Sequence, residues 1–363
     1  MRVGVDGRSL VGGGARGVAH YTGALLSALA TGYPDDEWRV LLPRGVVAPV
    51  PAGVLAVRST LPGRLLHGSA AAVGRPRADR MLGGDLDVFW APAPAPLAVS
   101  RGTPLVLTVH DRSWEERPGD FTPYERAWHR AARPKALARR ATRVLCDAEV
   151  VRADLVRAWG LPPERVRAVP LAPAAGLERA PASAPPQYLL FVGALEPRKA
   201  PDVLLAAYAL ARSLGVSAEL WFAGEGRLAP LLEGPGVRRL GRVDDAELAG
   251  LYAGAVALVL PSRIEGFGLP PVEALAQGTP VVASDLPVLR EVLGEGGALF
   301  VGVGDEKALA EALIRVTRDA GLRSSLAAAG RRATAGLSWA ATAQATREVL
   351  AEASRRPSIA SPG

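Results

Sequence analysis

The sequence predicts an α/β protein of two domains, each built on an open parallel sheet. At 363 residues the chain exceeds what one hydrophobic core usually serves. Strand-like apolar runs alternate with longer helical patterns in both halves, as in βαβ units. Between the halves, residues 170–186 are dense in Pro, Ala and Gly, which stops regular structure there.

The first domain is expected to span residues 1–172. Its predicted strands are Arg2–Asp6, Trp38–Leu42, Val88–Ala91, Leu105–His110, Arg143–Cys146 and Val166–Val169. Helical patterns fall between them, notably Ala19–Ala30 and Pro123–Arg140. This alternation predicts parallel strands joined by helical crossovers.

Residues 173–186 are the expected linker, and the second domain is expected to span 187–345. Its predicted strands are Tyr188–Gly193, Ala218–Ala223, Val237–Leu240, Val256–Leu260, Val281–Ala283 and Ala298–Phe300. Residues 346–363 are expected to form the end of a C-terminal helix and a disordered tail. Open parallel sheets bind ligands at the carboxyl ends of their strands, which we expect on facing sides of one cleft.

The composition indicates a globular protein, with 49% hydrophobic and 22% charged residues. Apolar stretches end before the ~20 residues that span a bilayer, and the N-terminus reads as a strand rather than a signal peptide. We therefore expect a cytoplasmic protein, and leave open a peripheral contact with the inner membrane face. The single cysteine, Cys146, excludes an internal disulfide, and the four histidines lack metal-ligand spacing.

The charge balance favours anionic partners, because 43 Lys and Arg face 36 Asp and Glu and give a net charge of +7. Phosphate-bearing substrates, anionic lipid and nucleic acid all fit this balance. Aromatic residues make up only 5% of the chain, and no nucleic-acid reading module is recognisable. We therefore expect no nucleic-acid partner.

The segment from Pro261 to Gly278 is the most informative. It follows an apolar strand, contains glycines that let the backbone approach a ligand, and has two prolines where a helix would begin. Such a loop offers free amides and the positive end of a helix dipole, which suit an anion. We expect Glu265 in the loop to face a sugar, and Glu273 in the first helical turn to bind a diol such as that of ribose.

These motifs resemble those of glycosyltransferase family 4, a retaining family with the GT-B fold of two Rossmann-like domains. The two glutamates lie on Glu-Gly-Phe-Gly-Leu-Pro and are followed by Gly-Thr-Pro-Val-Val-Ala. The resemblance runs the length of the chain. Residues 12–22 resemble the family's glycine loop and first helix, 108–111 its strand-end histidine motif, 191–199 its Arg-Lys phosphate clamp, and 241–248 the stretch lining its base pocket.

The resemblance implies a role for each matching residue. Arg198 and Lys199 would hold the donor diphosphate and stabilise charge on the leaving group in place of a metal. His110 would reach the donor sugar near the reacting carbon, without acting as general base, because the departing phosphate takes the acceptor's proton. The implied catalytic residues are His110, Glu265, Arg198 and Lys199. The implied donor-binding residues are Gly13, Gly14, Gly193, Arg198, Lys199, Val243, Glu265, Phe267, Gly268, Leu269 and Glu273.

The resemblance also implies the reaction, which is transfer of a hexose, with retention, from a nucleotide sugar to a hydroxyl acceptor. That acceptor could be a saccharide, a lipid-linked sugar or a small natural product, and neither metal nor another cofactor is implied. The pattern is closest to bacterial mannosyltransferase-like enzymes of polysaccharide biosynthesis, which favours GDP-mannose and leaves UDP-sugars open. His20 before Tyr21, and Ala200-Pro201 after the clamp, depart from the family pattern. A sugar-nucleotide epimerase and a non-catalytic nucleotide-binding scaffold remain alternatives.

Two acidic motifs are assigned to local structure. Asp85-Leu-Asp87 matches the Asp-x-Asp pattern that binds manganese in the other main glycosyltransferase fold, but it precedes a strand and so lies away from the expected ligand edge. We expect it to form a turn and the start of that strand. Asp244 and Asp245 are expected to cap a helix.

Overall fold

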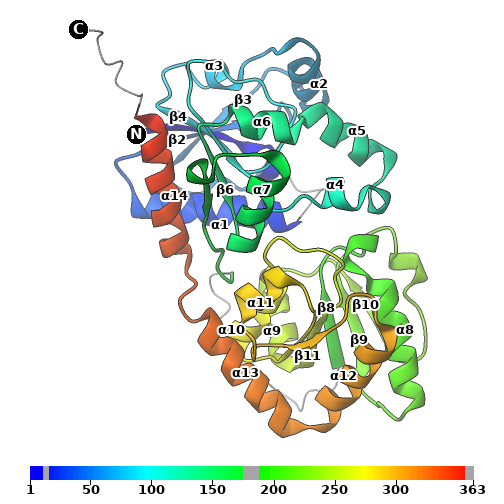
Figure 1. Cartoon of the computed structure of the whole chain (residues 1–363). Coiled ribbons are helices and arrows are strands. Elements are labelled where there is room, and N and C mark those ends of the chain that lie inside the picture. Colours follow the sequence, from blue (N-terminus) through cyan, green and yellow to red (C-terminus); the bar gives the residue numbers. More distant parts are fainter. Residues whose placement is uncertain (11–15, 175–187, 356–363) are drawn as a thin grey trace. The chain divides into compact units, whose positions relative to one another are not determined.

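The computed structural model describes residues 1–10, 16–174 and 188–355 (Figure 1). The chain forms two compact units. Unit 1 comprises 1–114, 121–170 and 339–363, and unit 2 comprises 115–120 and 171–338. Most of the expected linker, and the tail beyond residue 355, lie outside the described residues.

Unit 1 is built on a seven-stranded sheet in the order β3-β2-β1-β4-β5-β6-β7, with every neighbouring pair parallel. The strands are β1 (Arg2–Asp6), β2 (Glu37–Leu42), β3 (Val54–Arg58), β4 (Val88–Ala91), β5 (Leu105–Thr108), β6 (Arg143–Cys146) and β7 (Val166–Ala168). The six predicted strands are confirmed, although β5 ends two residues before His110. Edge strand β3 was not predicted, although Val54-Leu-Ala-Val57 is a short apolar run; its residues are only partly buried or exposed.

Along the chain, the helices of the N-terminal half alternate with these strands, and they surround the sheet in Figure 1. They are α1 (Arg16–Gly32), α2 (Gly63–Val73), α3 (Ala78–Met81), α4 (Ser113–Glu116), α5 (Pro123–Ala132), α6 (Pro134–Arg140) and α7 (Glu149–Trp159). The single helix expected at 123–140 is wrong, because it breaks at Arg133, which has a φ of 47°. Pro134 follows directly, and a proline disfavours helical geometry in the residue before it.

Unit 2 is built on a six-stranded parallel sheet in the order β10-β9-β8-β11-β12-β13. The strands are β8 (Tyr188–Val192), β9 (Glu219–Ala223), β10 (Val237–Gly241), β11 (Ala255–Leu260), β12 (Val281–Ser284) and β13 (Leu299–Val301). All six match the prediction within two residues. Residues of β8 and β11 are buried throughout, as expected for central parallel strands covered on both faces.

The helices of unit 2 complete a second Rossmann-like arrangement. They are α8 (Pro201–Ser213), α9 (Asp245–Gly254), α10 (Leu269–Gln277), α11 (Pro287–Leu293), α12 (Glu306–Arg318) and α13 (Ala320–Thr334). The core of this unit lies between the sheet and helices such as α8 and α12, with Phe191, Leu204 and Leu313 fully buried. No helix in the described part of the chain is long and apolar enough to span a bilayer.

The last helix, α14 (Trp339–Ser354), belongs to unit 1 rather than to the second half of the chain (Figure 1). It packs against α1, and Arg347 donates to the buried Asp36 carboxylate at 2.6 Å. The expected boundary at residue 345 therefore differs from the structure, in which unit 2 ends at Ser338. This long-range contact helps to hold α14 in unit 1. No break in amino-acid composition marks the point where the chain passes from unit 2 back to unit 1.

Candidate active site

The loops that follow β8 and β11 in unit 2 bring together two predicted site residues, Lys199 and Glu265. These strands are neighbours in the sheet, so their carboxyl ends lie side by side. Lys199 Nζ donates to Glu265 Oε1 at 2.5 Å, and Ser262 Oγ donates to the same oxygen at 2.7 Å. The two side chains of the ion pair are only 15% and 6% exposed. The other Glu265 oxygen accepts no hydrogen bond from the described residues, which leaves it available to a ligand.

Arg198 lies beside this ion pair, in the short turn Pro197–Lys199 between β8 and α8. Its carbonyl accepts a hydrogen bond from the Arg263 backbone N–H at 2.9 Å, which ties the two loops together. Its half-buried guanidinium makes no ion pair with any residue in the described ranges. A guanidinium on a fixed turn beside an ammonium group is suited to a diphosphate.

The helix predicted after the glycine loop is confirmed as α10. It begins after Gly268, which has a φ of 90°, and ends at Gly278, with a φ of 83°. A side chain at position 268 would also come within 2.6 Å of Leu289 Cδ2, so glycine is needed there. Phe267 is buried and Leu269 opens the helix. The free backbone amides at the start of α10 favour an anion. The helix directly follows the loop that carries Glu265 of the Lys199–Glu265 pair.

Glu273 was predicted in the first turn of α10. It is instead the fifth residue of the helix, because the helix already begins at Leu269. Its side chain is buried and accepts a hydrogen bond from the Tyr252 hydroxyl on α9 at 2.7 Å. A carboxylate held in this way is a fixed acceptor for a ligand diol. Val243, predicted at the base pocket, is buried just before α9, whose cap Asp244 accepts from Glu247 N at 2.8 Å as predicted.

Gly193 directly follows β8, at a point where two backbones meet. A side chain on Gly224, which follows β9, would lie 1.9 Å from the Gly193 carbonyl oxygen. The close approach keeps the ligand edge of the sheet free of side chains at this point. The sequence analysis did not identify Gly224. The predicted donor residues Gly13 and Gly14 lie outside the described residues.

His110 follows β5 in unit 1, and both of its ring nitrogens face oxygen atoms. Nδ1 is 2.7 Å from Asp147 Oδ2, and Nε2 is 3.1 Å from the Pro92 carbonyl oxygen. A carbonyl oxygen and an ionised carboxylate can each only accept hydrogen bonds. This geometry therefore fits an imidazolium that is protonated on both nitrogens. Burial alone would lower the pKa of His110, but the charge and hydrogen bond of Asp147 outweigh it and raise the pKa.

The ring of His110 is held in place by a buried aromatic network. Tyr21 of α1 meets it edge to face, with ring centroids 4.7 Å apart. The Tyr21 hydroxyl is 3.2 Å from Thr108 Oγ1, which also accepts from Trp90 Nε1 at 3.1 Å. Burial raises the pKa of the Tyr21 hydroxyl, so it stays neutral. Sequence reasoning missed Asp147, although its place directly after strand β6 marks the ligand edge.

A second group of polar side chains at the same edge of unit 1 was also missed. We call it the unit 1 polar cluster, and it consists of Asp6, Arg8, His67, Trp128 and His129. The Arg8 guanidinium lies 5.1 Å from the Trp128 ring centroid, and the His67 ring lies 5.4 Å from it. Asp6 and Arg8 form an ion pair at 3.5 Å.

Four members of this cluster carry a buried polar atom without a hydrogen-bond partner among the described residues. These atoms are Arg8 Nη1, His67 Nε2, His129 Nδ1 and Asp6 Oδ2, the last of which makes the 3.5 Å ion pair with Arg8 but no hydrogen bond. Burial lowers the pKa of both histidines, which favours their neutral forms. Buried polar groups are rarely left unpaired, so this concentration of donors and acceptors indicates a place for a polar ligand. Asp-Gly-Arg at the carboxyl end of β1 was the available signal.

The two acidic motifs have the local roles that were predicted. Asp85 pairs with Arg2 and Arg39, and Asp87 accepts from the Arg2 backbone N–H at 2.7 Å, at the amino end of β4. Cys146 is buried, and burial raises the pKa of its thiol, which makes it unreactive. In the described ranges, no three His, Cys, Asp or Glu residues gather as metal ligands.

Comparisons with known proteins bear on the family of the chain. Family descriptions match residues 15–172 as "Glycosyltransferase Family 4" and residues 186–319 as "Glycosyl transferases group 1". A D-inositol 3-phosphate glycosyltransferase of Frankia alni is 33% identical over 290 residues, which is 70% of each chain. A phosphatidyl-myo-inositol mannosyltransferase of Mycobacterium leprae is 40% identical over 164 residues, covering 43% of this chain and 44% of the relative.

Among solved structures, Anabaena Alr3699/HepE in complex with UDP and glucose matches with a TM-score of 0.72 at 19% identity. The match covers 97% of this chain and 100% of the other. Two Rossmann-like units in one chain are the components of the predicted GT-B fold class. From the extent of these matches, the chain belongs to glycosyltransferase family 4.

Proposed function

We propose that this glycosyltransferase moves a hexose from a nucleotide sugar to a hydroxyl acceptor, with retention of configuration and without a metal ion. The observation that carries the proposal is the group formed by Arg198, Lys199 and Glu265 at the carboxyl ends of β8 and β11. It places two cations and one carboxylate where open α/β sheets bind ligands. Family membership favours transfer over the epimerase and scaffold alternatives.

In this proposal the donor diphosphate binds to Arg198, Lys199 and the amides at the start of α10. These groups are fixed before the reaction, and they favour the charge that grows on the diphosphate as the glycosidic bond breaks. Lys199, which donates to Glu265, would also donate to the phosphate. Glu265 would accept from hydroxyls of the transferred sugar, and Glu273 from those of the ribose.

GDP-mannose is the proposed donor. The similarity to a relative named as a mannosyltransferase supports a mannosyl group, as does the resemblance of the motifs to bacterial mannosyltransferases. A UDP-sugar is the second candidate, because the structure of HepE, which this chain resembles in fold, contains UDP and glucose. A panel of GDP- and UDP-sugars tested for thermal protection and slow donor hydrolysis decides between them.

The acceptor is proposed to bind at the unit 1 polar cluster. Its unpaired atoms include donors and acceptors, and its aromatic rings can lie against an apolar face, as required for a polyhydroxylated ring. His67→Phe keeps a flat ring but removes Nε2, and should therefore raise the acceptor KM by about tenfold with donor binding unchanged. An unchanged acceptor KM in this variant would remove His67 from the acceptor site.

The metal requirement provides a direct test of the donor site. If the side chains and helix amides suffice for the diphosphate, thermal protection by GDP or UDP should be the same in EDTA and in magnesium or manganese. Arg198→Ala should weaken this protection under both conditions. If chelation abolishes nucleotide binding to the unaltered protein, then a metal takes part and the metal-free proposal fails.

A further inference from the structure

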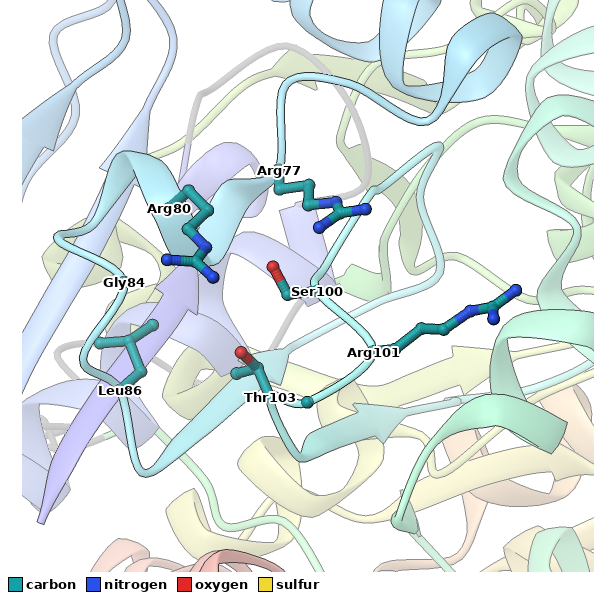
Figure 2. Close-up of a pocket in the computed structure, with 8 residues that line it drawn as sticks. Arg77, Arg80, Gly84, Leu86, Ser100, Arg101 and Thr103 are labelled. Atoms are coloured by element: carbon teal, nitrogen blue, oxygen red, sulfur yellow. The ribbon is translucent and has the colours of Figure 1, made fainter.

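A pocket of about 430 Å³ lies in unit 1 at the amino ends of β4 and β5 (Figure 2). Its walls are the start of α3 with Arg77 and Arg80, the turn around Gly84 that enters β4, and the 100–103 loop that enters β5. His110 follows the carboxyl end of β5, at the opposite edge of the same sheet. The pocket is therefore separate from the polar cluster proposed for the acceptor.

The walls of this pocket are held together by a buried carboxylate, so its shape does not depend on a ligand. Asp79 of α3 accepts from the Ser100 backbone N–H at 2.8 Å and from Thr103 Oγ1 at 3.0 Å. The Arg140 guanidinium donates to the Ser100 carbonyl oxygen at 2.7 Å. These bonds fix the loop before β5 against the helix that carries Arg80.

The pocket carries an excess of positive charge. Arg77, Arg80 and Arg101 line it, and none of the three forms an ion pair with a residue in the described part of the chain. The nearby carboxylates are already occupied, since Asp79 binds the loop and Asp85 pairs with Arg2 and Arg39. Figure 2 shows Arg77 and Arg80 on either side of Ser100, with Arg101 extending from the rim.

Ser100 adds a polar side chain to the pocket wall. The residue is only 6% exposed, and its hydroxyl interacts with the Asp79 carboxylate closely enough to help lower the pKa of that carboxyl, although not in a standard hydrogen-bond geometry. In Figure 2 the hydroxyl points into the space between Arg77 and Arg80. A buried hydroxyl oriented in this way can donate to an anion held by the two guanidinium groups.

We propose that this pocket binds a phosphate monoester group. The planar donor fork of arginine matches phosphate oxygens, and two or three guanidinium groups offset a dianion. The volume lies within the range of small-molecule sites, so part of the molecule that carries the phosphate also fits. The inference does not depend on the donor and acceptor assignments, because it uses none of their residues.

Modification of arginines by phenylglyoxal, followed by peptide mass spectrometry, tests the site residue by residue. The full-length protein is modified in inorganic phosphate, in chloride of equal ionic strength, and with phosphatidylcholine vesicles with or without phosphatidic acid. Arg44 and Arg64 serve as internal controls, since both are exposed arginines of unit 1 outside the pocket. Phosphate should slow modification of Arg77, Arg80 and Arg101, and leave both controls unchanged.

Two matched double variants complete the test, with Arg101 as the reporter. In Arg77→Gln/Arg80→Gln, protection of Arg101 should require about tenfold more phosphate, because charged hydrogen bonds are lost. In Arg44→Gln/Arg64→Gln, which loses the same charge, protection should be unchanged. Protection only by phosphatidic acid vesicles also supports the site and identifies a lipid as the source of the phosphate. No protection by either source, equal protection of the controls, or intact Arg101 protection without Arg77 and Arg80 overturns the proposal.

Discussion

His110 shows how the surroundings of a single residue restrict the chemistry it can perform. Both ring nitrogens lie within hydrogen-bond distance of oxygen atoms, of Asp147 and of the Pro92 carbonyl, and the pKa of His110 is raised, which favours the cation. An imidazolium in this position cannot take a proton from an acceptor hydroxyl. It can instead favour negative charge nearby, provided that a ligand displaces the Pro92 contact. That His110 does not act as a general base stays a prediction.

The His110–Asp147 pair predicts a pH-dependent contribution to stability. The folded pKa of His110 lies above its unfolded value of about 6.5. The stabilisation is therefore complete below that pH and is lost as the pH rises through the folded pKa. Asp147→Asn should lower the free energy of unfolding by about 1–3 kcal/mol at pH 6, and by less at pH 9. Urea titrations at both pH values measure this difference.

Ring-nitrogen NMR of ¹⁵N-labelled protein gives an independent control for that prediction. His110 should show two protonated nitrogens at pH 7, whereas His67 and His129, whose pKa values burial lowers, should show neutral rings. A neutral His110 at pH 7 would contradict the imidazolium assignment, whatever the stability data show.

Glu273 is the second residue whose role can be tested. The Tyr252 hydroxyl fixes its carboxylate, so a ribose diol would meet an oriented acceptor. Glu273→Ala should weaken nucleotide binding by about 1–3 kcal/mol, because the ribose hydroxyls lose their partner. Isothermal titration with GDP and UDP measures the loss. Glu273→Gln, which keeps an oxygen for Tyr252, serves as a control for folding, and normal binding by the alanine variant would exclude the ribose role.

At the scale of elements, the sequence predicted what depends on local pattern and missed what depends on distant partners. Central strands such as β8 and β11 were recognised because strands buried on both faces read as continuous apolar runs. The ends of α10 were recognised from its prolines and Gly278. Edge strand β3, with its short run Val54-Leu-Ala-Val57, was missed. The contact of Arg347 with Asp36, 311 positions away, cannot be read from one sequence.

The same distinction applies to the candidate site. Continuous sequence motifs carry four of the candidate residues, Arg198, Lys199, Glu265 and Glu273, so these could be selected from the sequence. The sequence could not show that Lys199 pairs with Glu265, or that the Tyr252 hydroxyl donates to Glu273. The unit 1 polar cluster draws on separate segments of the chain, whose side chains meet only in the fold. Its single-residue signals were too weak to identify it.

Helix α14 provides a test at this scale. The Asp36 carboxylate is 2% exposed and pairs with both Arg347 and the N-terminal amine. Burial would raise the pKa of Asp36, but these two cations outweigh it and lower the pKa. Arg347→Ala should destabilise unit 1 by about 1–3 kcal/mol near pH 7, because a buried carboxylate loses a partner. The effect should shrink as the pH falls through the folded pKa of Asp36, where the carboxylate is protonated.

Arg143→Ala is the matched control for this prediction. Arg143 also reaches α14, but its contact with Glu352 is long, at 3.5 Å, and exposed. Its loss should change stability by less than about 0.5 kcal/mol. Urea unfolding followed by tryptophan fluorescence reports on both variants. If the two substitutions lower the free energy of unfolding equally, the buried Arg347–Asp36 pair stabilises α14 no more than the exposed contact does.

At the scale of the whole molecule, the two units have different roles in the proposed reaction. The residues proposed to bind nucleotide lie in unit 2, apart from the glycine loop near the N-terminus, while His110 and the polar cluster lie in unit 1. His110→Ala should therefore reduce kcat far more than nucleotide affinity. Arg198→Ala should reduce both, because its diphosphate contact exists in the ground state and strengthens in the transition state. Full turnover in His110→Ala would return that residue to a structural role.

The stereochemical outcome follows from where the acceptor's proton can go. Since the surroundings of His110 favour its cation, the departing diphosphate is the base that the proposed reaction provides. A phosphate oxygen can take that proton only if the acceptor hydroxyl approaches on the face that the nucleotide leaves. Attack on this face retains the anomeric configuration, so an α-linked donor should give an α-linked product by ¹H NMR, with no covalent sugar–enzyme adduct in mass spectra. An inverted product would require a base on the opposite face and would contradict this mechanism.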